Sequence, residues 1–398
     1  MRNKPELLAP AGDLERLKAA FQYGADAVYF GGPAFGLRAN AINFTFEEMK
    51  EAANYAHSLN KKVYVTVNIV LHNKEANKLE AYLKEIEQTG IDAIIVSDPF
   101  VIQKAKECTN LEVHLSTQQS TINYEAAEFF HKQGVTRIVL GRECSKEEVS
   151  EIINKVPIEI ETFVHGAMCA GYSGRCVLSN YLTDRDANRG GCSQICRWDF
   201  DLLDEENKVL EGDKQFTLCS KDLSLLRHIP DMIEMGITSF KIEGRMRSIY
   251  YIATVVSIYR KVIDSYLANK DTYKYDESLE RVLRACANRD SVPQFFNGEY
   301  GNDCSYYNGR VEISNQDFLG LVISYDNGIA TIEQRNYFKK GDIVEIFGPK
   351  HDVITYTIDK IIAEDDNEIE IVRHPRQIVR IPIDIELNSY DMIRIKNS

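Results

Sequence analysis

The first 250 residues alternate between short apolar runs and longer segments with apolar positions at helical spacing. DLERLKAAFQYG and TFEEMKEAANYAHSLN are typical helical segments, and each is followed by a new β-branched run. This alternation predicts parallel strands covered by helices. The predicted strands are residues 6–12, 27–32, 62–70, 93–98, 112–117, 137–142, 158–166 and 239–244. Eight such units close a (β/α)8 barrel, so we predict an α/β fold of the TIM-barrel type. A doubly wound open sheet is the alternative, but APAGD is not the glycine-rich loop that usually follows its first strand.

The last third of the chain follows a different pattern. Residues 247–287 are helical in pattern, and residues 288–317 are typical of a linker. Beyond them FLGLVISYD, GIATIEQR, GDIVEIFG, VITYTIDKII, EIEIVRH and DMIRIKN alternate with turn residues, which predicts a small antiparallel β-barrel. We therefore expect a barrel domain at 1–270, a helical extension and linker at 271–312, and a C-terminal β-barrel domain at 313–398.

The carboxyl ends of the predicted strands carry several polar residues. In barrels of this type the chemistry gathers at those ends. The residues placed there are Asn68, Ser97, Asp98, Gln118, Arg142, His165, Glu243 and Arg245. A long insertion, roughly residues 167–220, begins where the seventh strand ends. Connections of that length are usually functional, so we expect this cysteine-rich insertion to cover the active-site face.

Four of the nine cysteines lie in this insertion, at Cys169, Cys176, Cys192 and Cys196. Their spacing, C-x6-C-x15-C-x3-C, lacks the C-x2-C pair on which zinc ribbons are usually built. Iron–sulfur clusters also need four thiolates, but they accept ligands from scattered loops. The glycines of the stretch allow backbone to approach a cluster, and its arginines can offset the negative charge. The residues favour an iron–sulfur cluster over zinc and leave redox or incidental thiols as a third alternative. Cys219 is a spare candidate, and the isolated Cys108, Cys144, Cys286 and Cys304 are predicted to be buried small side chains.

The composition limits the cellular compartment and the binding partners that we expect for this protein. The chain is 44% hydrophobic and 27% charged, which is typical of a soluble globular protein. It has no apolar run of signal-peptide or membrane-span length, so we expect a cytoplasmic protein without a disulfide framework. The net charge of −13 argues against broad attraction to nucleic acid, although local arginine clusters are compatible with RNA.

A catalytic cysteine and histidine pair is a further hypothesis, because His165 precedes Cys169 by four residues. A thiol protease needs a base within reach and a group that orients that base. Glu161 lies four residues before His165, so we expect both side chains on one face of the strand. Four thiols exceed what a protease needs. The chain contains no H-E-x-x-H helix, G-x-S-x-G elbow or P-loop.

Several segments resemble peptidase family U32. ELLAPAGDLERLKAAFQYGADAVYFGG is similar to the opening of that family, and ETFVHGAMCAGYSGRCVLS fits its signature at every fixed position. Those positions are Glu161, Phe163, Gly166, Ala167, Met168, Cys169, Gly174, Cys176, Leu178 and Ser179. SKDL and SFKIEGRMRS extend the resemblance, which covers about residues 5–265, and the C-terminal barrel resembles a domain appended in many members. CSQICRW is similar to the paired-cysteine segment of the tRNA-hydroxylating branch.

The resemblance implies an activity and a cofactor. The family includes collagenase-type proteases, RNA hydroxylases and oxygen-independent ubiquinone-hydroxylation proteins. The matching branch implies formation of 5-hydroxyuridine at the tRNA wobble position, with prephenate rather than oxygen as the oxygen source. It also implies that Cys169, Cys176, Cys192 and Cys196 ligate an iron–sulfur cluster of the 4Fe–4S type, with zinc as the alternative metal. LCSKDL departs from some relatives, so Cys219 is the alternative fourth ligand.

The implied reaction assigns roles to the other candidates. A dicarboxylate donor needs cations at the barrel mouth, and Arg38, Arg142, Arg175 and Arg245 lie in suitable loops. An unstacked base needs an aromatic plane, for which Tyr172, Tyr181 and Trp198 are candidates. Asn68 and Gln118 either bond a base edge or satisfy loop backbone. The expected catalytic residues are Glu161, His165, Asn68, Gln118 and Glu243. The partners are tRNA and prephenate, without a membrane. The alternatives are a collagenase-like protease and an RNA-binding protein with a structural metal site.

Overall fold

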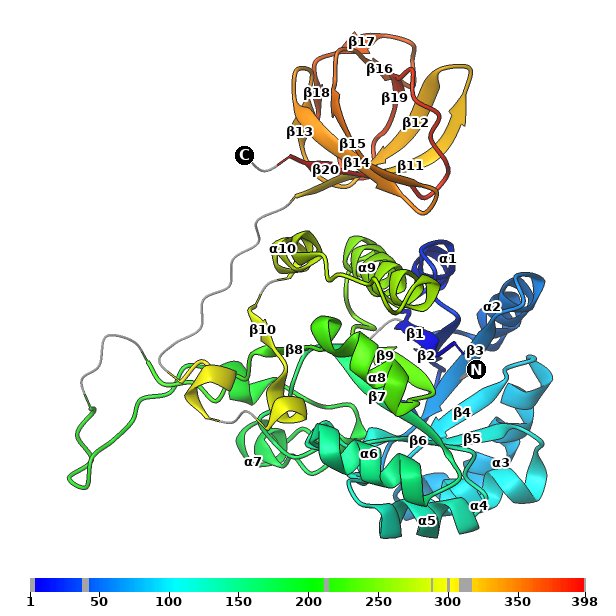
Figure 1. Ribbon diagram of the computed structural model, residues 1–398, viewed down its shortest axis with the longest axis vertical. Helices are drawn as coiled ribbons and strands as arrows, with labels where there is room; N and C mark the ends of the chain where they lie inside the picture. The colour runs from blue at the N-terminus through cyan, green and yellow to red at the C-terminus, as the bar shows by residue number, and fades with distance from the viewer. Residues whose placement is uncertain are drawn as a thin grey trace.

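A closed parallel barrel forms the larger part of the protein. The computed structural model describes residues 4–37, 43–210, 215–287, 289–298, 301–307 and 317–396. The barrel strands are β1 (Glu6–Pro10), β2 (Ala27–Gly31), β3 (Lys62–Val67), β4 (Ala93–Val96), β5 (Glu112–Leu115), β6 (Arg137–Val139), β7 (Glu159–Gly166) and β9 (Ser239–Ile242). Neighbours in this order pair in parallel, and β9 pairs with both β7 and β1, which closes the ring (Figure 1). The predicted TIM-barrel fold is confirmed.

Helices follow the strands and cover the barrel from outside (Figure 1). They are α1 (Leu14–Gln22), α2 (Phe46–Ser58), α3 (Asn73–Gln88), α4 (Pro99–Cys108), α5 (Tyr124–Lys132), α6 (Lys146–Lys155), α8 (Ile229–Met235) and α9 (Ile249–Ala268). Their starts are set by local chemistry. Thr45 with Glu48 and Ser145 with Glu148 form capping boxes that satisfy the first backbone N–H groups of α2 and α6. The apolar faces of the helices and the outward faces of the strands form one buried core.

The insertion between β7 and β9 differs in part from its prediction. The segment KDLSLLRHIPDMIEMG, residues 221–236, has the sequence pattern of a helix. In the structure it begins instead with β8 (Asp222–Ser224), which runs antiparallel to β7. The Asp222 carboxylate accepts two bonds from Arg289, at 2.9 and 2.7 Å, beside the short strand β10 (Ser291–Val292). The helix α8 starts only at Ile229, where Pro230 suits a first turn. A buried ion pair with a distant segment therefore overrides the local helical pattern.

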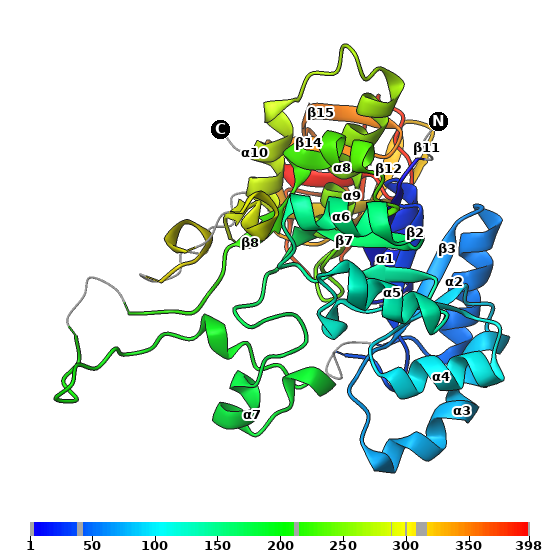
Figure 2. The same cartoon turned by 60° about the horizontal axis from the view of Figure 1, so that its bottom comes forward.

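The first part of the insertion, residues 167–198, is called the lid. It contains α7 (Leu178–Thr183) and the short 3-10 turns η2 (Ala187–Arg189) and η3 (Ile195–Arg197). The chain then runs into an arm in which Phe200 bridges to Phe216 and Leu203 to Val209. This arm extends away from the barrel in both views (Figures 1 and 2).

The C-terminal strands form an antiparallel sheet, as predicted. They are β11 (Phe318–Asp326), β12 (Ile329–Gln334), β13 (Phe338–Lys339), β14 (Ile343–Gly348), β15 (His351–Thr357), β16 (Ile361–Ala363), β17 (Glu368–Ile369), β18 (Ile371–Val372), β19 (Ile378–Pro382) and β20 (Met392–Ile395). The main sheet has the order β15-β14-β20-β11-β12-β19-β16-β17 and surrounds its own apolar core. The sequence pattern missed β19, and it merged β15 and β16 into one strand.

The C-terminal sheet packs against the outer helices of the barrel. The Tyr23 hydroxyl at the end of α1 donates to the Tyr390 carbonyl at 2.8 Å, and Tyr250 of α9 stacks on Phe318 with ring centroids 5.3 Å apart. The preceding helix α10 (Glu277–Cys286) also packs on α9. Within the described ranges, every helix is too short or too polar to cross a membrane.

Candidate active site

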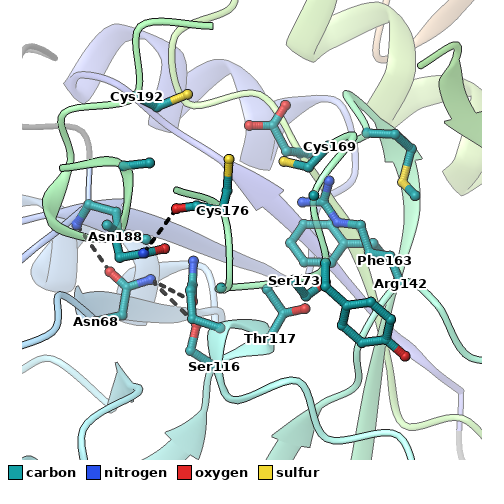
Figure 3. A pocket seen from close by; sticks show the side chains of 18 of the residues that line it. Asn68, Ser116, Thr117, Arg142, Phe163, Cys169, Ser173, Cys176, Asn188 and Cys192 are labelled. Atoms are coloured by element: carbon teal, nitrogen blue, oxygen red, sulfur yellow. Dashed lines mark hydrogen bonds between the residues drawn. The ribbon is translucent and has the colours of Figure 1, made fainter. Parts of the chain in front are cut away.

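A cavity of about 210 Å³ lies between the carboxyl ends of the barrel strands and the lid (Figure 3). Its wall from the barrel includes Tyr29, Thr66, Asn68, Ser116, Thr117, Gln118, Arg142, Glu143, Phe163, Lys241, Glu243 and Arg245. Its wall from the lid includes Met168, Cys169, Tyr172, Ser173, Gly174, Cys176, Asn188, Cys192, Ile195 and Cys196. The lid thus covers the face at which TIM barrels place their chemistry.

The four lid cysteines all line this cavity. Figure 3 shows the sulfur atoms of Cys169, Cys176 and Cys192 turned toward the same space. Burial and the nearby Cys169 raise the pKa of Cys196 to about 11. None of the nine cysteines forms a disulfide in the described structure.

The lid cysteines provide suitable donor atoms for a metal, but they are not arranged as a site for a single metal ion. Thiolate sulfur is the ligand that iron–sulfur clusters and zinc both accept. Within the described ranges, however, no three His, Cys, Asp or Glu side chains form a group that could hold a single metal ion. Cys219 is only 1% exposed and is not part of the cavity wall, so Cys196 is the better placed of the two alternative fourth ligands.

One side of the lid is fixed to the barrel by Glu143. The Glu143 carboxylate accepts from the Ser173 backbone N–H at 2.9 Å and from the Ser173 hydroxyl at 2.9 Å. The next residue, Gly174, has φ of +71°, and a Cβ there would lie 2.0 Å from the Gln118 carbonyl oxygen. Only glycine permits this approach, so the lid is seated directly on the loop after β5.

The other side of the lid is fixed to the loop after β3. The Asn188 carbonyl accepts from the Val70 N–H at 3.2 Å, and the Asn188 amide donates to the Cys176 carbonyl at 3.1 Å. Arg189 forms an ion pair with Glu75 at the start of α3, and this pair lowers the pKa of Glu75 to about 2. The two attachments hold the thiols over the barrel mouth.

The cavity floor carries three cations. Arg142 lies 3.9 Å above the centroid of the Phe163 ring and donates to the Ala167 carbonyl, while its buried Nε has no partner in the described structure. Lys241 Nζ lies 4.4 Å from the Tyr29 ring centroid. Arg245 donates to the Thr66 hydroxyl at 3.2 Å.

The charge of Lys241 is balanced below the floor. Its Nζ donates to Glu161 at 2.6 Å, and Arg137 donates to the other oxygen of the same carboxylate at 3.3 Å. Burial raises the pKa of Glu161, but the two cations outweigh burial and leave that pKa below its usual range. Glu161 is fully buried and lies outside the cavity wall. Its geometry is that of a residue that positions Lys241.

Asn68 and Gln118 belong to one polar network at the mouth of β3 and β5. The Asn68 carbonyl oxygen accepts from the Leu37 N–H at 3.1 Å, and its amide donates to Ser116 at 3.4 Å and to Gln118 Oε1 at 3.2 Å. Asn68 therefore satisfies loop backbone, one of the two expected roles. Within the described residues Gln118 uses only Oε1 in this network, so its Nε2 can donate to a ligand.

The expectation that His165 and Glu161 share one face is wrong. A β-bulge between Phe163 and His165 inserts an extra residue in β7 and reverses the direction of the following side chain. His165 therefore packs against α9, with Nδ1 3.4 Å from the Tyr259 hydroxyl, and it is not part of the cavity wall. Burial, with the Arg247 charge, lowers the pKa of His165 to about 3, so this ring is neutral.

The remaining candidates are divided by the structure. Glu243 and Tyr172 line the cavity, and Tyr172 is also exposed to solvent. Arg175 is exposed, lies outside the cavity wall and donates to the Ser120 hydroxyl at 3.1 Å. Arg38 lies outside the described residues.

Several wall residues escaped the sequence analysis, among them Lys241, Tyr29 and Glu143. Lys241 and Tyr29 point inward from strands, and Glu143 anchors the lid. Lys241 carried a usable signal, because a lysine in the middle of the apolar run SFKIEG is rare unless the ammonium has a buried partner. The sequence around Tyr29 and Glu143 gives no such signal, since the residues that they contact are distant in sequence.

Comparison with known proteins matches most of the chain to one family and its appended domain. The model of peptidase family U32 matches residues 12–305, and the model of the family's C-terminal domain matches residues 314–394. A "tRNA hydroxylation protein P1" of Bacillus subtilis (strain 168) is 50% identical over 98% of this chain and 94% of that protein. A "23S rRNA 5-hydroxycytidine C2501 synthase" of Escherichia coli (strain K12) is 37% identical over 67% of this chain and 40% of its own length. A "Collagenase" of Porphyromonas gingivalis (strain ATCC BAA-308 / W83) is 32% identical over 91% of both chains.

Proposed function

The chain belongs to peptidase family U32, and from that premise we propose that it is an RNA hydroxylase that converts the wobble uridine of tRNA to 5-hydroxyuridine. The observation that carries this proposal is the meeting of four thiols and three cations in one cavity. The similarity to the tRNA hydroxylation protein, over nearly the whole of both chains, supports the same substrate class.

In the proposed enzyme Cys169, Cys176, Cys192 and Cys196 hold an iron–sulfur cluster. A four-iron cluster spreads its thiolates over separate iron atoms, so it takes ligands that are farther apart than those of a single ion. Four thiols around one cavity, with no compact three-ligand group in the described residues, suit such a cluster better than zinc. The bound cluster would supply redox or Lewis-acid chemistry at the cavity wall.

The floor cations would bind the oxygen donor, which we propose is prephenate. Each carboxylate of a dicarboxylate needs a cationic partner away from water, and guanidinium groups provide two parallel donors. Arg142 presents a buried Nε without a partner in the described structure, and Lys241, held by Glu161, lines the same cavity. Replacing C5–H of the uridine by C5–OH removes two electrons from the base. In a balanced exchange a C–O bond of the donor breaks as the C5–O bond forms, and the donor takes up the two electrons and the displaced hydrogen.

The base would enter the same cavity beside the polar network. Gln118 Nε2 can donate to a base carbonyl because its Oε1 is already held by Asn68 and Ser116. Thr117 and Tyr172 complete that side of the wall.

The geometry gives proteolysis less support. A thiol protease needs a histidine within hydrogen-bond reach of the nucleophile. His165 faces α9, and the described cavity wall contains no histidine. The collagenase relative keeps this activity worth measuring, and gelatin cleavage by the purified protein is the direct measurement.

The proposal is tested by combining metal analysis with nucleoside analysis. The protein is purified without oxygen, and iron, acid-labile sulfide and zinc are quantified. It is then expressed in a strain that lacks wobble 5-hydroxyuridine, and tRNA nucleosides are measured by mass spectrometry. We expect iron and sulfide in the wild type, and 5-hydroxyuridine that requires both the protein and prephenate synthesis.

Matched variants assign the roles. Cys176→Ala should lose iron, sulfide and the nucleoside together, whereas Cys108→Ala, at the far end of α4, should retain all three. Arg142→Ala should keep the iron but lose the nucleoside. Zinc without iron would overturn the proposed iron–sulfur cluster. An iron-loaded protein that leaves tRNA unmodified would overturn the proposed hydroxylase activity.

A further inference from the structure

The outer face of the lid exposes large apolar side chains. In α7, Leu178 and Ser179 face the cavity, whereas Tyr181 is 84% exposed and Leu182 54% exposed. Trp198 follows η3, which packs on α7, and is 46% exposed. Figure 2 shows α7 at the edge of the molecule, beyond the ring of barrel helices.

This exposure is concentrated in one part of the chain. Nine of the twenty exposed large apolar side chains in the described residues lie between Tyr172 and Leu210. Single exposed apolar residues are ordinary, whereas their concentration in one segment indicates a binding surface. An aromatic ring that contributes little to the fold remains available to stack on a partner.

Charge divides this exposed region into two parts. Residues 167–198 contain four arginines and two aspartates, without lysine or glutamate, so the lid has a net charge of +2. Residues 199–210 contain five acidic residues and one lysine, so the neighbouring arm has a net charge of −4. The lid is therefore a positive area on a chain whose total charge is −13.

Three of the lid arginines form no ion pair within the described residues. Arg189 is the exception, because it is paired with Glu75. Arg175 and Arg197 donate to neutral oxygens, those of the Ser120 hydroxyl and the Gln194 amide. Arg185 is exposed next to the end of α7.

We propose that the outer face of the lid binds the single-stranded RNA on either side of the target base. Bases next to the target stack on Tyr181 and Trp198, and their phosphates meet Arg175, Arg185 and Arg197. Exposed aromatic rings interleaved with arginine are the features that hold unpaired nucleotides without reading a duplex. The acidic arm next to the lid repels a phosphate backbone, so it marks the limit of this surface. The inference rests on the proposed function, because that function requires an unstacked base in the cavity beneath.

The test measures RNA binding and does not depend on catalysis. A fluorescently labelled anticodon stem-loop is titrated with the anaerobically purified full-length protein, and affinity is read by polarisation at several salt concentrations. Tyr181→Ala and Trp198→Ala should each weaken binding by about tenfold, within the range for loss of one base–aromatic stack. Arg185→Ala should reduce the salt dependence by about 0.7 in the logarithmic slope, the value for one phosphate contact to a single strand.

The controls lie on the C-terminal sheet. Tyr337, 49% exposed, and Arg373, also exposed, offer the same substitutions away from the lid. Tyr337→Ala and Arg373→Ala should leave the affinity within twofold of wild type. Weaker binding in these variants with normal binding in the lid variants would overturn the proposal and move the RNA to the C-terminal sheet. Lid variants that bind RNA normally but alter the sedimentation of the protein would also overturn it, in favour of a protein partner.

The result is separable from the proposed function. Lid variants that bind RNA weakly would support this surface even when the wild type hydroxylates no base. A wild type that hydroxylates tRNA together with lid variants of normal affinity would overturn the surface alone. Iron and sulfide contents equal to wild type would show that Tyr181→Ala and Trp198→Ala leave the cavity side of the lid intact.

Discussion

Within the barrel, Glu161 is held by Lys241 and Arg137 from neighbouring strands, whereas in the lid Cys176 is held mainly through backbone contacts such as that between its carbonyl and Asn188. The interior charges extend to Glu6, which accepts from Arg137 at 2.6 Å and from the Tyr64 hydroxyl at 2.6 Å. Each buried ion thus has several partners on a rigid sheet. The lid has few hydrogen-bonded elements of its own and is fixed at two edges. The comparison indicates that the buried ion pairs of the barrel stabilise the fold and also position the site. The lid cysteines, in contrast, can be replaced without loss of the fold.

The largest effect should come from breaking the interior network. Glu161→Ala removes the carboxylate that pairs with the buried Lys241, while Arg137 keeps Glu6 and Glu159. Breaking such a buried pair costs about 3–5 kcal/mol. Urea unfolding measures the change. Glu51→Ala removes the exposed partner of Lys18 on α2 and should cost no more than about 1 kcal/mol. Equal losses in the two variants would show that the interior charges are not coupled to the fold.

A second effect of the interior depends on pH. The pKa of His165 is about 3 in the folded protein, well below the ordinary value, so the unfolded chain binds the proton more readily. The contribution of His165 to the free energy of unfolding is therefore fully present above about pH 6.5, and it is lost as the pH falls toward 3. Between pH 6.5 and 5 the loss from this one group is about 2 kcal/mol. Unfolding free energies of wild type and His165→Phe across this range should diverge by that amount, and parallel curves would contradict the assignment.

A substitution where the lid contacts the loop after β5 should have a smaller and local effect on stability. Gly174→Ala adds a Cβ that would meet the Gln118 carbonyl in a left-handed conformation, and backbone strain of this kind costs about 1–3 kcal/mol. Hydrogen exchange should accelerate at lid amides, including that of Ser173, while the barrel strands remain protected. Gly341→Ala is the matched control, because its φ is +88° but no atom lies within 4 Å of the new Cβ. It should cost less and leave lid exchange unchanged.

The smallest effect on stability is expected at a lid thiol. Cys176→Ser in the metal-free protein should change the unfolding free energy by less than about 1 kcal/mol, because the side chain is only partly buried. Cys144→Ser places a hydroxyl in the core and should cost about 1–3 kcal/mol. The metal content should show the opposite order, with iron lost only in Cys176→Ser. Iron loss in both variants would mean that the site depends on the barrel core.

Much of the architecture was predictable because it depends on neighbouring residues. Alternating apolar runs and amphipathic helices identified all eight barrel strands, and the length of the insertion after the seventh strand identified the segment that covers the strand ends. Short pairings between distant segments were missed. β8 forms against β7 and is braced by the Asp222–Arg289 pair, and nothing local distinguishes it from a helix start.

The sequence by itself determined the periodicity of the chain, the family and the set of thiols, since these are properties of residue order. Only the tertiary structure decided which side chains meet. Lys241 reaches Glu161 from 80 residues away, and this contact holds the Lys241 amine on the cavity wall. A single extra residue in β7 turns His165 away from the thiols, although the sequence puts it only four residues from Cys169. Side-chain direction in a strand alternates with each residue, so one bulge reverses what spacing alone predicts.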